Sequence, residues 1–161
     1  MVCAFTGHRP QHLPWKDREA DPRCAALKTM LLAAVEQAAA LGAETFLCGM
    51  ARGCDLYFAE AVLEAKRKNP LLRLIAMLPC PEQANRWPER DRLRHEALCC
   101  LCDEVCVVEP LYTEGCMLRR NYAMIDRAQL LITVFDGTPG GTAATVAYAE
   151  QKGLQLLPIW L

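Results

Sequence analysis

The 161-residue chain lacks an excess of charge of either sign, because 18 lysines and arginines nearly balance 19 aspartates and glutamates. Proteins that bind duplex nucleic acid usually present a strongly basic face. The balance therefore argues against nucleic acid as a partner, although it leaves room for a local positive pocket. The sequence also lacks any apolar run approaching the roughly 18 residues that a membrane helix needs, so we expect a soluble globular protein without membrane association.

A secretory signal is lacking as well, because Val2–Phe5 is too short for a hydrophobic core region and no basic segment precedes it. The sequence predicts a cytoplasmic protein whose ten cysteines are reduced. Cys99, Cys100, Cys102 and Cys106 lie close together, but the pattern has no second paired half, as zinc sites usually have. We interpret these four residues as small buried hydrophobic side chains and expect no metal site.

The two common nucleotide-binding motifs are absent. The chain has no G-x-x-x-x-G-K-[ST] segment, and no G-x-G-x-x-G segment follows its first apolar run. These absences disfavour a P-loop NTPase and an ordinary dinucleotide-dependent dehydrogenase.

Apolar runs instead alternate with segments of helical periodicity along the whole chain. Because the apolar runs are continuous, they are typical of parallel strands that are buried on both faces. The pattern predicts an α/β protein with a three-layer, Rossmann-like, doubly wound and mainly parallel sheet, in a single domain of residues 1–161. The predicted strands are Val2–Phe5, Thr45–Cys48, Leu72–Leu78, Glu104–Val108, Leu130–Phe135 and Gln155–Ile159. The predicted helices are about 23–41, one through Ala59 and Lys66 that ends at Asn69, about 88–101, about 118–127, and one ending near Lys152.

Three unusual loops directly follow predicted strands, at Thr6–Pro10, Gly49–Asp55 and Asp136–Thr142. Ligands of open α/β sheets bind beyond the carboxyl ends of the strands, so these loops should meet at one edge. In the third loop, consecutive glycines let backbone N–H groups approach a ligand closely, and the next helix presents its positive end. This arrangement predicts a phosphate cradle; the alternative is a tight turn in which Thr142 only caps the helix.

Four segments carry a resemblance to a known family: FTGHRP, CGMARGCDLYFAEAVL, EGCMLRRNYAMIDRAQLLITVFDG and PGGTAATVAYAEQKG. In this order they resemble the SLOG superfamily, specifically its YpsA-like branch; the superfamily also includes the DNA-processing protein DprA and the LOG phosphoribohydrolases. The resemblance covers almost the whole chain. It implies a Rossmann-like fold with a pocket for a nucleotide or a nucleotide-derived ligand, such as ADP-ribose or an NAD derivative. The glycine-rich motifs of the family correspond to Gly7, Gly49, Gly53, Gly140, Gly141 and Thr142.

The last of these segments, which begins Pro139-Gly140-Gly141, departs from the pattern of the LOG enzymes. In those enzymes Pro-Gly-Gly-x-Gly-Thr is followed closely by a glutamate. Ala143 and Ala144 stand where Gly-Thr would be, and Val146 and Ala147 stand where the acid would be. We therefore expect a ligand-binding sensor or regulatory protein, with no catalytic residue assigned. One alternative is a LOG-like N-glycosidic hydrolase of nucleoside monophosphates, with Glu60 or Asp55 as the acid. A second alternative is a DprA-like module that interacts with single-stranded DNA.

Charged residues at the ends of strands and starts of helices complete the candidate site. Arg9 and His8 follow the first strand, where an arginine could contact phosphate. The position of Asp55 at a helix start is typical of an N-cap, and the family resemblance implies the alternative role of a partner for a ligand hydroxyl. The candidate ligand-binding residues are Gly7, His8, Arg9, Gly49, Gly53, Asp55, Arg119, Arg120, Asn121, Asp136, Gly140, Gly141 and Thr142.

Three further interpretations concern residues outside this set. Trp87 either stacks on a base or packs over the sheet edge, and the segment 11–22 with Trp15 is predicted to be a surface loop that could cover the site. Arginines alternate with acids in the helix near residue 90, which predicts a solvated face including Arg94. We also expect self-association into a homo-oligomer.

Overall fold

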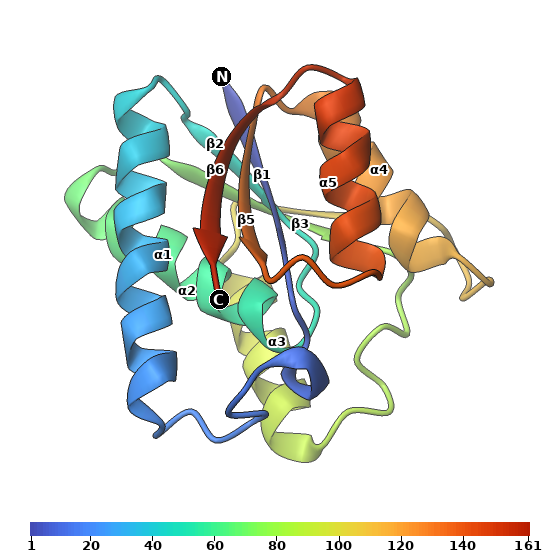
Figure 1. The fold of residues 1–161 in the computed structure, drawn as a ribbon. Helices are drawn as coiled ribbons and strands as arrows, with labels where there is room; N and C mark the ends of the chain where they lie inside the picture. Colours follow the sequence, from blue (N-terminus) through green and yellow to red (C-terminus); the bar gives the residue numbers. More distant parts are fainter.

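The computed structural model describes all residues from 1 to 161, and its six strands form one parallel sheet. The order across the sheet is β4-β3-β2-β1-β5-β6 (Figure 1). The prediction of a parallel sheet is confirmed, and each predicted strand ends within two residues of the observed one. The strands are β1 Val2–Gly7, β2 Thr45–Cys48, β3 Arg73–Leu78, β4 Glu104–Val107, β5 Leu130–Phe135 and β6 Gln155–Trp160.

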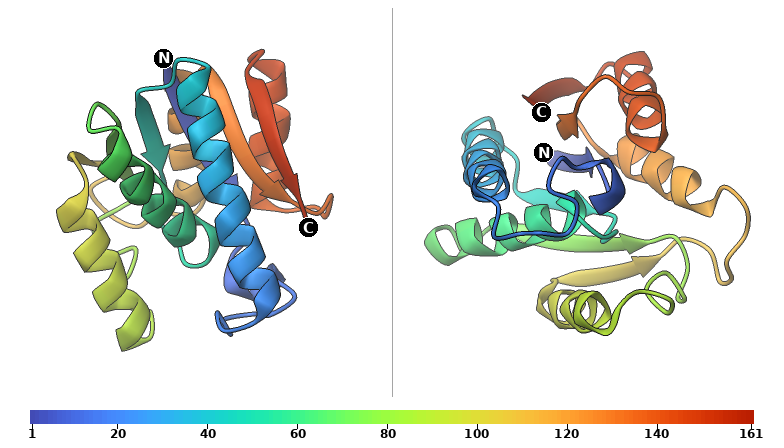
Figure 2. Two further views of the ribbon diagram at one scale, coloured as in Figure 1. Left: turned by 90° about the vertical axis from the view of Figure 1, so that its left-hand side faces the viewer. Right: turned by 60° about the horizontal axis from the view of Figure 1, so that its bottom comes forward.

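Helices cover both faces of the sheet and give three layers, as predicted (Figure 2). Helices α1, α2 and α3 contribute to a core cluster on one face, and α4 and α5 contribute to the core on the other face. A short 3₁₀ helix, Pro10–His12, follows β1 and was not predicted. The α-helices are α1 Pro22–Ala40, α2 Cys54–Lys68, α3 Glu89–Leu101, α4 Cys116–Arg127 and α5 Gly141–Gln151. None of them is both long and apolar enough to cross a membrane.

Alternation of side chains along β1 explains why both faces are covered. Phe5 points into the larger cluster and stacks on Phe58 of α2, with the ring centroids 4.4 Å apart. Ala4 points to the opposite face, where it joins Met124 of α4 and Ala149 of α5. A strand that buries both sets of side chains cannot have a solvated face, which is why its sequence is a continuous apolar run.

The strand order reverses between β1 and β5, and this reversal decides where a ligand can bind. From β1 the chain adds β2, β3 and β4 outward in one direction, and it then returns to place β5 on the other side of β1. The loops that follow β1 and β5 therefore diverge from adjacent strands and leave space between them at the carboxyl edge.

Two of the expectations for the surface need correction. The segment 11–22 is not simply a surface loop, because Leu13 and Trp15 are fully buried in the cluster with α1 and α2. Arg94 is not solvated: it forms ion pairs with Glu19 at 2.6 Å and with Glu60 at 2.7 Å. Trp15 is buried because its indole has a large apolar area. Arg94 is drawn from solvent because its guanidinium reaches carboxylates on two other segments of the chain. In both cases the tertiary contacts override the local polar pattern.

The cysteines also differ from expectation in part. All ten are free, and six are buried, but Cys100 is exposed, and Cys99, Cys102 and Cys106 are only half-buried. Cys99 and Cys102 pack against the larger core cluster and Cys106 against the smaller one, so the interpretation of the four as small buried side chains is wrong for Cys100 and holds only in part for the other three.

Candidate ligand-binding site

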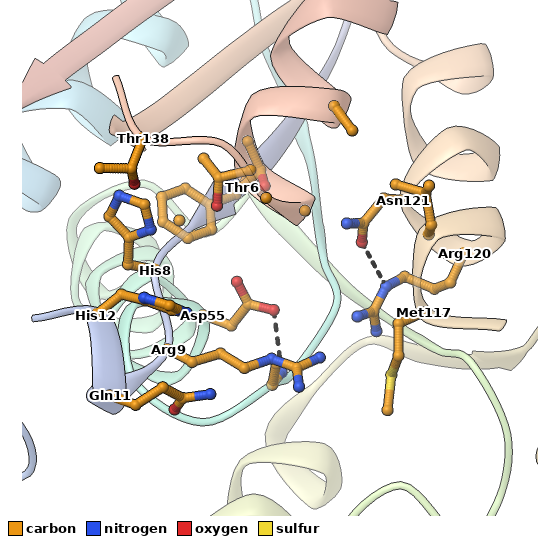
Figure 3. Close-up of a pocket in the computed structure, with 18 of the residues that line it drawn as sticks. Thr6, His8, Arg9, Gln11, His12, Asp55, Met117, Arg120, Asn121 and Thr138 are labelled. Atoms are coloured by element: carbon orange, nitrogen blue, oxygen red, sulfur yellow. Dashed lines mark hydrogen bonds between the residues drawn. The ribbon is translucent and has the colours of Figure 1, made fainter. Parts of the chain in front are cut away.

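A pocket of about 380 Å³ lies at the carboxyl edge of the sheet, at the reversal between β1 and β5 (Figure 3). Its volume falls within the roughly 300–1,000 Å³ typical of small-molecule sites. Its walls are the loops after β1, β2 and β5, the first turns of α2 and α5, and the first two turns of α4. The structure brings nine of the thirteen candidate residues into this lining: Gly7, His8, Arg9, Asp55, Arg120, Asn121, Gly140, Gly141 and Thr142.

The first turn of α5 forms one wall of the pocket. Its N-cap is Gly140, with φ at 149°, and no side chain caps the helix. Thr142 therefore lies inside the helix and is not its cap, so the capping interpretation is wrong. A Cβ atom added at Gly141 would meet no atom within 4 Å, which shows how open this turn is. The N–H groups of a first helical turn have no partner inside the helix and form a ready anion site.

Arg120 supplies a buried positive charge beside this turn, since only 2% of the residue is exposed. Its Nη1 donates to the carbonyl oxygens of Gly49 and, at 3.0 Å, of Met77, and its Nε donates to Oδ1 of Asn121 at 2.8 Å. No carboxylate lies within ion-pair distance of the guanidinium, and burial lowers the pKa of Arg120. A buried cation with only neutral acceptors would be stabilised by an anion in the pocket.

A chain of hydrogen bonds connects Arg120 to the glycine-rich turn. Asn121 Nδ2 donates to Thr145 Oγ1 at 3.1 Å, and Thr145 Oγ1 donates to the carbonyl oxygen of Gly141 at 2.8 Å. Thr145 is fully buried. The network holds the guanidinium on α4 and the first turn of α5 in a fixed relation to each other.

Asp55 is the one carboxylate that lines the pocket. The N-cap of α2 is Gly53, so Asp55 lies in the first turn and the N-cap interpretation is wrong. Its Oδ2 accepts a hydrogen bond from the backbone N–H of Ala51 at 3.0 Å, whereas Oδ1 has no partner within the protein. Burial raises the pKa of Asp55, and the charges of Arg120 and Arg9 oppose that shift. The free oxygen can accept a hydrogen bond from a ligand hydroxyl.

His8 and Asp136 join the two loops at the reversal. His8 Nε2 lies 3.0 Å from Asp136 Oδ1, and only 6% of the histidine is exposed. The same carboxylate accepts from the backbone N–H and the Oγ1 of Thr138, at 3.0 and 2.6 Å. These bonds, chiefly the one from the Thr138 side chain, lower the pKa of Asp136 to about 2. Asp136 therefore holds the start of the glycine-rich loop rather than lining the pocket.

The other three candidate residues, Gly49, Gly53 and Arg119, do not line the pocket, and the contacts around each of them explain why. Gly49 lies against the Arg120 guanidinium, where an added Cβ would come within 2.6 Å of Cζ. Gly53, with φ at 84°, approaches the carbonyl oxygen of His8 so closely that a Cβ would lie 2.9 Å from it. Arg119 turns away from the pocket and forms an ion pair with Glu109 at 2.9 Å.

Sequence reasoning missed several lining residues, for which the signals were weak. Gln11 and His12 reach the pocket because the 3₁₀ helix turns the chain back beside β1. Met117 begins the first turn of α4 just ahead of the arginines, and neither period nor charge distinguishes it from a core residue. The lining residues outside the candidate set are Phe5, Thr6, Gln11, His12, Ala51, Met117, Leu118, Thr138, Pro139 and Ala144, of which Thr6, Ala51, Thr138 and Pro139 belong to the three loops predicted to meet at this edge.

The chain matches a known sequence family over nearly its whole length. The family described as YpsA, the YspA SLOG family, matches residues 3–156. The chain belongs to this family. The resemblance noted from the four motifs is thereby confirmed, and the match includes every wall of the pocket.

Individual relatives of this YpsA-family chain have similar lengths. The chain is 27% identical over 147 residues to the uncharacterized SPbeta prophage-derived protein YoqJ of Bacillus subtilis, covering 83% of this chain and 86% of that protein. It is 29% identical over 158 residues to a UPF0398 protein of Bacillus thuringiensis, covering 94% and 84%.

The fold also occurs in a solved structure. DNA processing protein A from Helicobacter pylori, studied for its single-stranded DNA binding mode, superposes with a TM-score of 0.65 at 16% sequence identity. The similarity covers 98% of this chain and 64% of that one, so the bacterial DNA-processing protein has a substantial part with no counterpart here.

Proposed function

We propose that this YpsA-family chain binds a nucleotide or a nucleotide-derived ligand of the ADP-ribose or NAD type and acts as a sensor or regulatory protein. The uncapped first turn of α5, facing the buried Arg120, is the observation that supports it best. Both features favour a phosphate group at the same wall of the pocket. Arg9 lies on the far side of Asp55 from the α5 turn in Figure 3, where its cation adds to the positive potential of the pocket.

The middle of the pocket suits a ribose. Asp55 lies between Arg9 and the α5 turn in Figure 3, and its Oδ1 has no partner in the protein. A carboxylate that accepts hydrogen bonds from ribose hydroxyls is a common feature of nucleotide sites on this type of sheet. The proposal therefore assigns phosphate to Gly140, Gly141 and Thr142, and sugar to Asp55.

Gly141→Asp tests the phosphate position. An added Cβ would meet no atom within 4 Å and the position requires no positive φ, so the fold should be retained. Its negative charge should repel phosphate and weaken adenosine 5′-monophosphate binding by about tenfold or more, comparable to one lost charged contact. Isothermal titration calorimetry measures the change.

Gly141→Asn is the matched control, because it adds nearly the same volume without the charge. We expect the asparagine variant to bind the nucleotide clearly more tightly than the aspartate variant. Equal affinities in the wild type and both variants would refute the assignment of phosphate to this turn.

A second candidate function, N-glycosidic hydrolysis of nucleoside monophosphates, is favoured by one observation: Asp55 is a buried carboxyl group with a raised pKa at the proposed sugar position. A carboxyl group of this kind can donate a proton to a leaving base. The other carboxylate considered for the role, Glu60, is ion-paired with Arg94 and does not line the pocket. Chromatographic detection of free base from a panel of monophosphates tests hydrolysis: turnover that disappears in Asp55→Asn would favour the enzyme over the sensor.

A further inference from the structure

A second pocket, of about 130 Å³, adjoins the main one. The two share four lining residues, among them Arg9 and Met117, so a ligand in the main pocket can extend into the second. The additional residues are Arg52, Gln83 and Trp87, which come from the loop after β2 and from the segment between β3 and α3.

The second pocket differs chemically from the phosphate end of the main pocket. Arg52 is ion-paired with Asp91 at 2.8 Å, so its charge is already compensated. Met117, from the first turn of α4, is the one lining residue that belongs to an α-helix, and it also lines the main pocket. The only other cation in the lining is Arg9, which is shared with the main pocket and can serve the phosphate there, so an uncharged ring fits the additional space better than a second phosphate.

Trp87 provides an aromatic surface in this pocket. The indole is half-buried and is held by an edge-on contact with His95, with the ring centroids 5.1 Å apart and the planes at 77°. An indole fixed in this way is suited to stacking on a heterocyclic base, and such stacking does not depend on charge.

Gln83 provides the hydrogen-bonding group of the pocket, because its amide oxygen has no partner in the protein. Its Nε2 donates to the carbonyl oxygen of Gly49 at 3.1 Å, while its buried Oε1 has no hydrogen-bond partner. Because a carbonyl oxygen only accepts, the Gly49 contact fixes which end of the amide is the nitrogen. The residue is 7% exposed, so the unpaired oxygen is an unfavourable feature of the free protein.

The amide of Gln83 can turn toward a ligand without leaving Gly49 unpaired. Arg120 donates to the same carbonyl oxygen, so that acceptor keeps a partner when Gln83 moves. A turned glutamine amide presents one donor and one acceptor side by side. This is the pattern that pairs with the amino group and the adjacent ring nitrogen of adenine.

We propose that the second pocket is a base subsite, in which Trp87 stacks on an adenine ring and Gln83 recognises its amino edge. The inference rests on the proposed function, because it requires phosphate at α5 and sugar at Asp55. The base then lies beyond Arg9 and Met117, which occupy the side of the main pocket farthest from α5 in Figure 3.

Calorimetry with three probes separates the subsite from the phosphate site. Adenosine 5′-monophosphate carries the phosphate, the ribose and the adenine base. Ribose 5-phosphate lacks the base, and purine riboside 5′-monophosphate lacks only the amino group of the base. We expect the wild type to bind adenosine monophosphate about tenfold or more tightly than ribose 5-phosphate. It should bind adenosine monophosphate about three- to tenfold more tightly than the purine riboside compound, the difference expected from one hydrogen bond.

Two variants test the residues. Trp87→Leu should weaken adenosine monophosphate binding about fivefold or more and leave ribose 5-phosphate within about twofold. Gln83→Met, which keeps the shape of the side chain without the amide, should abolish the discrimination against purine riboside monophosphate. Trp160→Leu and Gln37→Met are the controls; Trp160 is 64% exposed on β6, Gln37 is exposed on α1, and neither should change any affinity.

Trp87→Phe is the control that separates loss of stacking from a folding defect. It keeps an aromatic ring and should therefore retain most of the affinity that the leucine variant loses. Tryptophan fluorescence offers an independent signal: adenosine monophosphate should quench the wild type but not Trp87→Leu, which retains Trp15 and Trp160.

The outcomes distinguish the two proposals. If the wild type binds adenosine monophosphate and ribose 5-phosphate equally, or if neither Trp87→Leu nor Gln83→Met changes these affinities, the base subsite is refuted while the phosphate site stands. If the wild type binds none of the three probes, the proposed function is refuted and the subsite with it.

Discussion

At the scale of single residues, Gly49 has the most demanding position in the site. It lies outside the pocket, yet its missing side chain leaves room for the buried Arg120, and its carbonyl oxygen accepts from that arginine and from Gln83. One small residue therefore positions both the proposed phosphate partner and the proposed base partner. Sequence patterns mark such a glycine as part of a loop, but they do not show what occupies the space beside it.

Gly49→Ala should destabilise the protein. An added Cβ would lie 2.6 Å from Cζ of Arg120, and the guanidinium cannot move aside without breaking its bonds to two backbone carbonyls. We expect a loss of about 1–3 kcal/mol in the free energy of unfolding, as for other overpacked buried positions. Urea unfolding followed by circular dichroism measures it. The control, Gly141→Ala, adds a methyl group in open space and should change stability by less than about 0.5 kcal/mol.

At the scale of elements, the site depends on the contact between α4 and α5. The predicted helix of about 118–127 correctly placed Arg119, Arg120 and Asn121 within α4, near its start, but the sequence could not tell which of them face the pocket. Arg119 and Arg120 differ by one position, which is about 100° around a helix. The direction of each side chain depends on the packing of α4 against the sheet, and this packing is tertiary information. Arg120 consequently enters the core while Arg119 meets Glu109.

Thr145→Val tests the connection between the two helices. Valine keeps the volume of the buried side chain but removes the bond to the Gly141 carbonyl and the acceptor of Asn121. We expect a loss of about 1–3 kcal/mol in the free energy of unfolding, because Asn121 Nδ2 loses its acceptor. Thr29→Val is a close control: Thr29 makes the same type of bond, to the carbonyl oxygen four residues earlier, but it is exposed on α1. Equal losses in the two variants would show that the connection contributes nothing beyond a local helix bond.

At the scale of the whole molecule, the architecture was predictable because it depends on pattern rather than on individual contacts. Six continuous apolar runs separated by helical segments leave few arrangements other than a covered parallel sheet. The order of the strands was not predictable in this way, because no local feature of the sequence indicates that β5 lies beside β1. The reversal, and with it the position of the pocket, had to be assumed from the general behaviour of such sheets and from the family resemblance.

A ligand bound at this reversal should stabilise the whole fold. At a free concentration of 100 times its dissociation constant, a ligand of the native state adds about 2.7 kcal/mol. For a chain of this length each 1 kcal/mol raises Tm by about 2–4 °C, so adenosine monophosphate should raise it by roughly 5–10 °C. Differential scanning fluorimetry measures the shift. Gly141→Asp at the same nucleotide concentration should show a clearly smaller shift, and an identical shift would place the nucleotide elsewhere.

The return of the chain across β1 also divides the molecule into two cooperating parts. Residues 5–55 supply one side of the pocket and residues 117–144 supply the other, and the exposed stretch around Tyr112 connects the two parts of the chain. If the backbone were cut in that stretch, neither fragment would hold a complete site. A nucleotide bound as proposed would then favour reassembly of the two pieces, and the molecule could serve as the basis of a split biosensor.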